Sequence, residues 1–145
     1  MKREAVFLDA NILFSVAYGS PGLNRLWELE GKGVCTLLAS QYVIEEARRN
    51  LESRGQITKL DACLKRVTVV TETDPDLVCP IDLPEKDIPV LMAAVSAGAE
   101  FLVTGDITHF GPYFGRTVMG VQILMARDYI FPRMTEEQFP DPKNH

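Results

Sequence analysis

Five short apolar segments, separated by longer helical patterns, constrain the fold of this chain more than any other feature. They lie at 4–8, 34–38, 67–70, 101–103 and 118–124, and each is rich in Val, Leu, Ile or Phe. Such short apolar runs are typical of strands buried on both faces. Strands that alternate with helices form βαβ units. The sequence therefore predicts an α/β fold with a mainly parallel sheet of about five strands and helices on both sides.

The helical patterns complete this outline. They are expected at 11–18, 23–31, 40–54, 57–64, 84–98 and 126–130, with Ser40 as an N-cap and an irregular acidic loop at 71–83. The 145 residues, 46% of them hydrophobic, suffice for one core. We expect a single domain over residues 1–131, followed by a polar, proline-containing tail at 132–145.

Four acidic residues are predicted to meet at one end of this sheet. Asp9 and Asp106 each follow a buried strand, and the carboxyl ends of parallel strands form the ligand-binding edge of an open α/β sheet. Glu46 borders the apolar face of its helix, and Asp87 lies on the apolar face of the next crossover helix. Four neighbouring carboxylates repel one another unless a cation holds them together. Oxygen ligands favour Mg²⁺ or Mn²⁺, and the absence of a Cys/His cluster argues against zinc.

Each of these acids also has a local explanation. Asp9 is suited to cap the helix that follows it, and Asp87 to cap a helix with Pro89 in its first turn. Glu46, by position alone, suits a solvated helix residue, and Asp106 suits a turn. Their joint placement at one edge of the sheet is what favours a metal site.

Three further polar residues are candidates to support this site. Asn11 and Thr104 are placed to donate hydrogen bonds to a carboxylate and to fix its rotamer. Local capping or turn chemistry is the alternative for both. His109 is one of two histidines, and its position in a turn beside Phe110 favours a structural or substrate-positioning role over that of a catalytic base.

Charge and cysteine content limit the expected partners and cellular location of the protein. The 20 acidic and 15 basic residues leave a formal net charge of -5, which argues against a general electrostatic grip on nucleic acid. The three cysteines are widely spaced and match no metal-binding pattern, so reduced thiols in an intracellular protein are expected. No apolar run is long enough to span a membrane. We therefore expect a soluble, cytoplasmic protein without a membrane partner.

Several motifs resemble the PIN domain ribonuclease family over roughly residues 4–130. The most specific is the longest, because its two acids and the small residues between them stand at the family's spacing. The motifs are FLDANIL with Asp9, SQYVIEEARRNL with Glu46, DIPVLMAAVSAGAEFLVTGD with Asp87 and Asp106, and THF with His109.

The resemblance implies a three-layer α/β/α sandwich and Mg²⁺- or Mn²⁺-dependent cleavage of RNA. It assigns Asp9, Glu46, Asp87 and Asp106 as the catalytic and metal-binding acids. Many similar members are toxins of toxin-antitoxin pairs, so RNA and an antitoxin protein are the expected partners.

One departure from the family pattern concerns the positions after Asp106. Several members have a further acid there, whereas this chain has Ile107, Thr108, His109 and Phe110. A second cation is therefore expected to bind weakly or only together with substrate.

The expected reaction is phosphodiester hydrolysis, in which an activated water displaces the 3′ oxygen in line. Three aromatic residues, Phe110, Tyr113 and Phe114, are candidates to stack on bases, to pack a loop or to form a homodimer contact. Candidates for a phosphate-binding rim are the basic residues Arg48, Arg49, Lys59, Lys65, Arg66 and Arg116.

Two other functions compete with this interpretation. A phosphatase of the haloacid dehalogenase type would use Asp9 as a nucleophile, but that chemistry expects a second acid at the position of Asn11. A non-catalytic PIN-like module would bind RNA or protein without cutting it, and the intact set of carboxylates disfavours this alternative.

Overall fold

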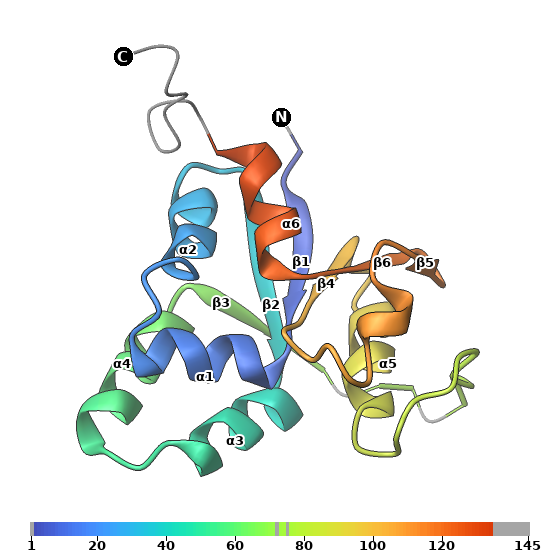
Figure 1. Ribbon diagram of the computed structural model, residues 1–145, viewed down its shortest axis with the longest axis horizontal. Coiled ribbons are helices and arrows are strands. Elements are labelled where there is room, and N and C mark those ends of the chain that lie inside the picture. Colours follow the sequence, from blue (N-terminus) through green and yellow to red (C-terminus); the bar gives the residue numbers. More distant parts are fainter. Residues whose placement is uncertain (1, 72, 75, 135–145) are drawn as a thin grey trace.

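A computed structural model describes residues 2–71, 73–74 and 76–134 and has one six-stranded sheet at its centre (Figure 1). The strand order is β3-β2-β1-β4-β6-β5, and neighbouring strands are parallel except for the antiparallel pair β5 and β6. This arrangement confirms the predicted α/β class and the mainly parallel sheet. The strands are β1 (Glu4–Leu8), β2 (Cys35–Ser40), β3 (Val67–Val70), β4 (Phe101–Val103), β5 (Thr117–Val118) and β6 (Val121–Leu124).

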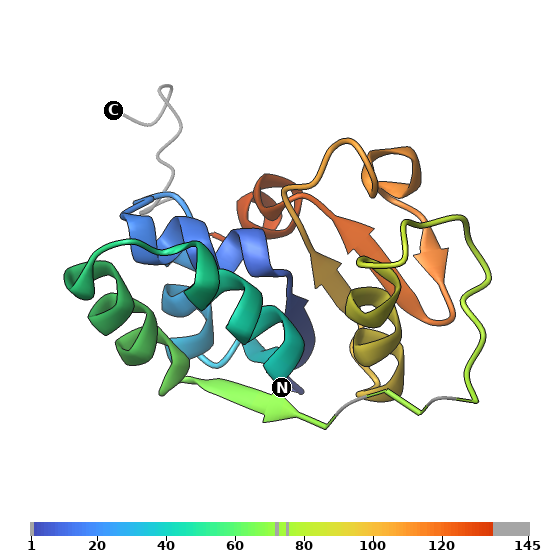
Figure 2. The same cartoon turned by 90° about the horizontal axis from the view of Figure 1, so that it is seen from below.

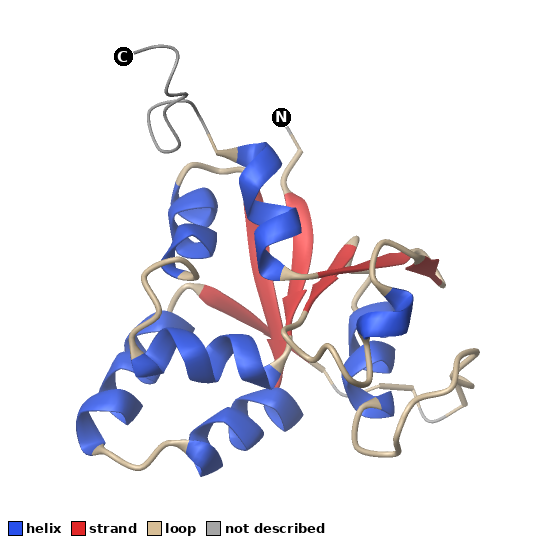
Figure 3. Ribbon diagram, in the orientation of Figure 1, coloured by secondary structure: helices blue, strands red, loops and turns tan. Residues whose placement is uncertain are grey.

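Helices flank this sheet. Figures 1 and 2 show α1 to α4 grouped on one side of the sheet and α5 on the other, and Figure 3 separates the helices from the strands by colour. The change of side follows from the topology, because the chain steps from β1 outward to β3 and then returns past β1 to form β4. The helices are α1 (Ala10–Tyr18), α2 (Asn24–Gly31), α3 (Gln41–Asn50), α4 (Arg54–Leu64), α5 (Ile88–Ser96) and α6 (Ala126–Ile130).

The two central strands, β1 and β4, are buried toward their carboxyl ends. Phe7 and Leu8 of β1 and Leu102 and Val103 of β4 are fully buried. Burial on both faces explains why these strands lack polar alternation. The residues that follow them are thereby held at a fixed position on the edge of a rigid core.

The helix predicted from Ser40 to about residue 54 is interrupted. Ser40 caps it as predicted, since its Oγ accepts a hydrogen bond from the Val43 N–H at 3.4 Å. However, α3 ends at Asn50 and the backbone is extended at Leu51. Ser53 and Gln56 then form a capping box that begins α4 at Arg54, three residues earlier than expected. The extended backbone at Leu51 ends the first helix, and the capping box starts the second.

The segment 118–124 is a hairpin rather than one strand. Met119 and Gly120 have φ values of 49° and 86°, and they connect β5 to β6. Positive φ at both central residues defines the two-residue turn that suits the twist of a hairpin. This turn accounts for the sixth strand of the sheet.

The last described residues contact β1 through an ion pair. The Arg133 guanidinium donates to Glu4 Oε1 at 2.6 Å and to Oε2 at 3.1 Å, and it lies over the ring of Tyr129. The predicted tail at 132–145 falls outside the described residues from position 135 onward, and the domain boundary after residue 131 stays a prediction. Within the described part of the chain, no helix is both long and apolar enough to cross a membrane.

The hairpin turn provides a test of the fold. Met119→Asn should raise the free energy of unfolding by roughly 1 kcal/mol, because Asn adopts left-handed backbone angles more readily than Met. Urea unfolding measures the change. Met119→Gln is the matched control, since it adds a similar amide without the conformational preference. An equal gain from both variants would contradict the backbone explanation.

Candidate functional site

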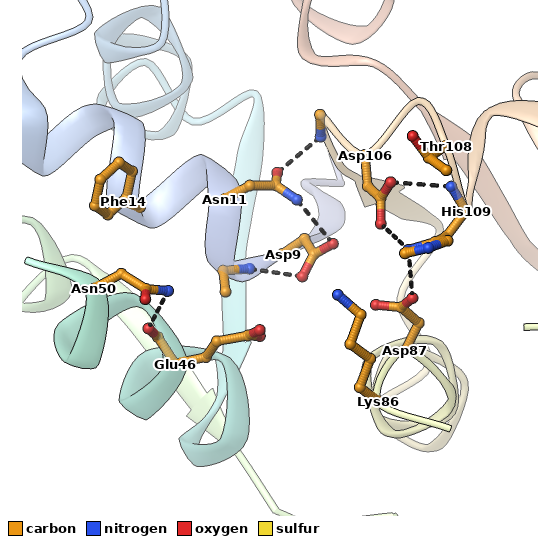
Figure 4. Close-up of a pocket in the computed structure, with 12 residues that line it drawn as sticks. Asp9, Asn11, Phe14, Glu46, Asn50, Lys86, Asp87, Asp106, Thr108 and His109 are labelled. Atoms are coloured by element: carbon orange, nitrogen blue, oxygen red, sulfur yellow. Dashed lines mark hydrogen bonds and ion pairs between the residues drawn. The ribbon is translucent and has the colours of Figure 1, made fainter. Parts of the chain in front are cut away.

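The site lies where the chain changes direction in the sheet. The chain leaves β1 toward β2 on one side, while β4 pairs with β1 on the other, with Leu8 opposite Val103. This is the topological switch point at which open α/β sheets bind ligands. A cavity of about 680 Å³ opens there (Figure 4). It is lined by Asp9, Ala10, Asn11, Phe14, Glu46, Asn50, Lys86, Asp87, Gly105, Asp106, Thr108 and His109.

Asp9 caps a helix and also lines the cavity. Its Oδ1 accepts a hydrogen bond from the Ala10 N–H at 2.7 Å and so caps α1. Its Oδ2 accepts hydrogen bonds from Thr104 Oγ1 at 2.8 Å and from Asn11 Nδ2 at 3.2 Å. Helix capping therefore orients this carboxylate at the cavity.

The Thr104 hydroxyl connects the two strand ends. It donates its proton to Asp9 and accepts hydrogen bonds from Asn11 Nδ2 at 3.2 Å and from the Asp106 N–H at 3.1 Å. Asn11 Oδ1 accepts a further hydrogen bond from the Gly105 N–H at 2.8 Å. One fully buried hydroxyl thus uses its donor and both acceptor positions.

Burial changes the protonation of two of the acids. Removal of Asp9 from water raises its pKa from 3.8 to about 6, although the hydrogen bond from Thr104 opposes this and Glu46 adds to it. Burial also raises the pKa of Asp87, and nearby Lys86 opposes that increase. A cation bound near both groups would favour their ionised forms and lower both pKa values.

A second group of side chains faces Asp9 across the cavity. Asp106 Oδ1 accepts a hydrogen bond from the His109 N–H at 3.0 Å and closes a turn. His109 Nδ1 lies 2.9 Å from Asp106 Oδ2 and 3.0 Å from Asp87 Oδ2. Asp87 Oδ2 is buried and receives no hydrogen bond, because the geometry directs the imidazole contact at Asp106. Asp87 stands at the N-cap position of α5, but its side chain makes no capping hydrogen bond.

The structure divides the four predicted acids into two groups. Among the described residues, Asp87, Asp106 and His109 have ligand atoms that all lie within 4.8 Å of one another. Asp9 lies across the cavity from them, and the Glu46 carboxylate reaches into the space between from α3 (Figure 4). Glu45, the neighbour of Glu46, is exposed.

Other residues of the cavity had only weak sequence signals. Phe14 follows Asn11 by three positions, Asn50 follows Glu46 by four, and Lys86 directly precedes Asp87. Spacings of three and four place side chains on the same helix face. Lys86 extends toward the cavity (Figure 4), and its backbone carbonyl accepts a hydrogen bond from the Tyr42 hydroxyl at 2.8 Å. That bond joins α3 to the residue before Asp87.

Two groups proposed for substrate binding lie elsewhere. The lining of this cavity, taken over the described residues, includes none of the six predicted rim residues. Arg48 pairs with Asp61, and Arg66 pairs with Glu30. Phe110 is fully buried in the core, which excludes it from stacking on a base. Phe110 packs in the hydrophobic core instead of facing the cavity.

Comparisons with known proteins agree with this arrangement of a mainly parallel sheet and flanking helices. The PIN domain family matches residues 5–108 of the sequence. This chain therefore belongs to the PIN domain family. No curated protein sequence matches it significantly.

A solved structure shares the fold. It is a chain in the crystal structure of VapBC2 from Rickettsia felis bound to a DNA fragment from their promoter. The match has a TM-score of 0.57 and 17% sequence identity, and it covers 82% of this chain and 96% of that chain. The likeness supports the predicted arrangement of strands and helices.

The raised pKa of Asp9 predicts a pH dependence of stability. Because its folded pKa of about 6 exceeds the ordinary 3.8, its contribution to stability is full below about pH 4 and is lost as the pH rises through about 6. In chelator-treated protein, Asp9→Asn should gain on the order of 2 kcal/mol relative to wild type between about pH 4 and pH 7. Urea unfolding at both pH values measures this difference, and parallel pH profiles would contradict it.

The Thr104 hydroxyl predicts a second change in stability. Thr104→Val keeps the side-chain shape but removes three hydrogen bonds, so it should lower the free energy of unfolding by about 1–3 kcal/mol. Thr68→Val on β3 is the matched control, because Thr68 is exposed. That control should change stability by no more than about 0.5 kcal/mol. Equal effects of the two substitutions would argue against the buried network.

Proposed function

We propose that this protein is a divalent-metal-dependent ribonuclease, with Asp9, Glu46, Asp87 and Asp106 as its metal-binding and catalytic acids. The observation that carries the proposal is the convergence of these four side chains on one cavity at the carboxyl edge of the sheet. Membership of the PIN domain family supports the same activity. Mg²⁺ and Mn²⁺ are the cations that suit carboxylate oxygens of this kind.

The chemistry of the donor set fits such a cation. Asp87 Oδ2 is buried without a hydrogen bond, and a buried carboxylate oxygen is costly unless a donor or a cation satisfies it. Asp9 is 4% exposed and faces further negative charge from Glu46 and Asp87. A positive ion between the two groups would relieve both costs.

The residues of the chain prepare the site for a phosphodiester. Asn11 and Thr104 hold Asp9 in a fixed rotamer. Lys86 extends into the cavity and is placed to contact a phosphate of the substrate (Figure 4). When bound, divalent cations supply an activated water and stabilise the charge that develops on the scissile phosphate.

We further propose that the protein is the toxin of a toxin-antitoxin pair. The similar fold of a chain from a VapBC2 complex supports this proposal, and an antitoxin would inhibit the nuclease by covering the acidic cavity. Co-expression with the protein encoded by the adjacent gene, followed by pull-down and cleavage assays, tests this assignment. Full nuclease activity in the presence of every neighbouring gene product would count against it.

Adjacent glutamates provide a matched test of the nuclease. Glu46→Gln should lower the rate of single-stranded RNA cleavage in Mg²⁺ or Mn²⁺ by about 100-fold or more, because the side chain lies in the cavity. Glu45→Gln makes the same chemical change one residue earlier, at an exposed position, and should retain the wild-type rate. Asp9→Asn and Asp106→Asn should be inactive, while EDTA should abolish cleavage by the wild type.

The outcome separates the nuclease from its main competitor. If calorimetry detects Mn²⁺ binding but the wild type cleaves no RNA, a non-catalytic binding module is favoured. Full Mg²⁺-dependent activity in Asp9→Asn would overturn the assignment of the acids.

A further inference from the structure

We infer that His109 is itself a metal ligand, and that Asp87, Asp106 and His109 form a site selective for a first-row transition ion such as Mn²⁺ over Mg²⁺. This inference rests on the proposed function, in which the cavity binds a divalent cation. Its evidence is the local arrangement of three donor atoms. It replaces the substrate-positioning role considered for His109.

The donor atoms already stand at the separation that a cation requires. His109 Nδ1 is 2.9 Å from Asp106 Oδ2 and 3.0 Å from Asp87 Oδ2. Two ligands bound at right angles and at about 2.1 Å from an ion are about 3.0 Å apart. All three ligand atoms lie within 4.8 Å of one another. One ion can therefore contact the imidazole and both carboxylates once Asp106 Oδ2 moves off the line of its present hydrogen bond with Nδ1.

An unsatisfied oxygen faces this position. The Asp87 side chain is 10% exposed, and its Oδ2 has no hydrogen bond although it lies 3.0 Å from the imidazole nitrogen. A single imidazole N–H cannot serve two carboxylates equally, and here it serves Asp106. A cation contacts all three donors at once, which a proton on Nδ1 cannot do.

The turn that carries His109 is held before any ion binds. The His109 N–H donates to Asp106 Oδ1 at 3.0 Å, and the Phe110 N–H donates to the Asp106 carbonyl at 3.1 Å. Phe110 is fully buried and anchors the end of the turn in the core. Asp87 comes from the start of α5. The site therefore joins two elements whose backbones are fixed independently.

The imidazole gives the site its preference among cations. Nitrogen ligands suit Mn²⁺, Co²⁺, Ni²⁺ and Zn²⁺, whereas Mg²⁺ takes oxygen ligands and retains several waters. For Nδ1 to offer its lone pair, the proton of a neutral imidazole moves to Nε2, so the ring keeps its charge. One nitrogen and two carboxylate oxygens form a donor set that differs from the Cys/His clusters of structural zinc sites.

Electron paramagnetic resonance of the intact, Mn²⁺-loaded protein tests the ligand directly. The wild type should show nitrogen modulation in its electron spin echo, from the ¹⁴N of a bound imidazole. His109→Ala should lose this modulation and bind Mn²⁺ about tenfold or more weakly. Mg²⁺ affinity, measured by competition, should change much less. His145→Ala is the control for the other histidine and should retain the modulation.

A third variant should weaken the preference for Mn²⁺. His109→Asp replaces the nitrogen by a carboxylate oxygen, so it should lower the ratio of Mn²⁺ to Mg²⁺ affinity relative to wild type. Circular dichroism establishes that each variant is folded. The spectrum of the wild type needs no substitution, and absence of nitrogen modulation there would overturn the inference whatever the variants do.

Cleavage of RNA, measured in parallel, distinguishes this inference from the proposed function. Nitrogen-coupled Mn²⁺ in a wild-type protein that cuts no RNA would reject the nuclease and support the ligand. A Mg²⁺-dependent nuclease whose bound Mn²⁺ shows no nitrogen coupling would reject the ligand and support the nuclease.

Discussion

The site depends first on one buried hydroxyl group. Thr104 Oγ1 donates to Asp9 and accepts from Asn11 and from the backbone of Asp106. These groups belong to the ends of two neighbouring strands, β1 and β4, and the loop that follows β4 takes its direction from the same hydroxyl. Because the hydroxyl has no unused donor or acceptor, it leaves little freedom in the distance between the two halves of the cavity.

Two of the acids stabilise local structure with one carboxylate oxygen and face the cavity or His109 with the other. Asp9 caps α1 with one oxygen and faces the cavity with the other. Asp106 closes its turn with Oδ1 and contacts His109 with Oδ2. The capping and turn explanations for these residues are therefore compatible with a site. A carboxylate whose rotamer is already fixed loses less entropy when it binds a ligand.

The parts that were predictable from the sequence depend on short-range periodicity. Apolar runs predicted the parallel strands, and the residues after them, Asp9 and Asp106, lie at the expected edge of the sheet. The contact of His109 with Asp87 was not predictable, because it joins a turn to the start of a helix through tertiary packing. Helical periodicity continues across residues 51–53 and does not predict the end of α3 at Asn50; the sequence signal for the break is the capping box of Ser53 and Gln56.

The separation of the site residues along the chain also bears on how the protein is made. The hydrogen bond from Thr104 to Asp9 spans 95 residues of sequence. It cannot form during synthesis until β4 and Thr104 have left the ribosome. At about 5–20 residues per second, this interval lasts several seconds or longer. During that time the chain lacks Asp106 and His109, so a partly synthesised molecule has no complete acidic cavity.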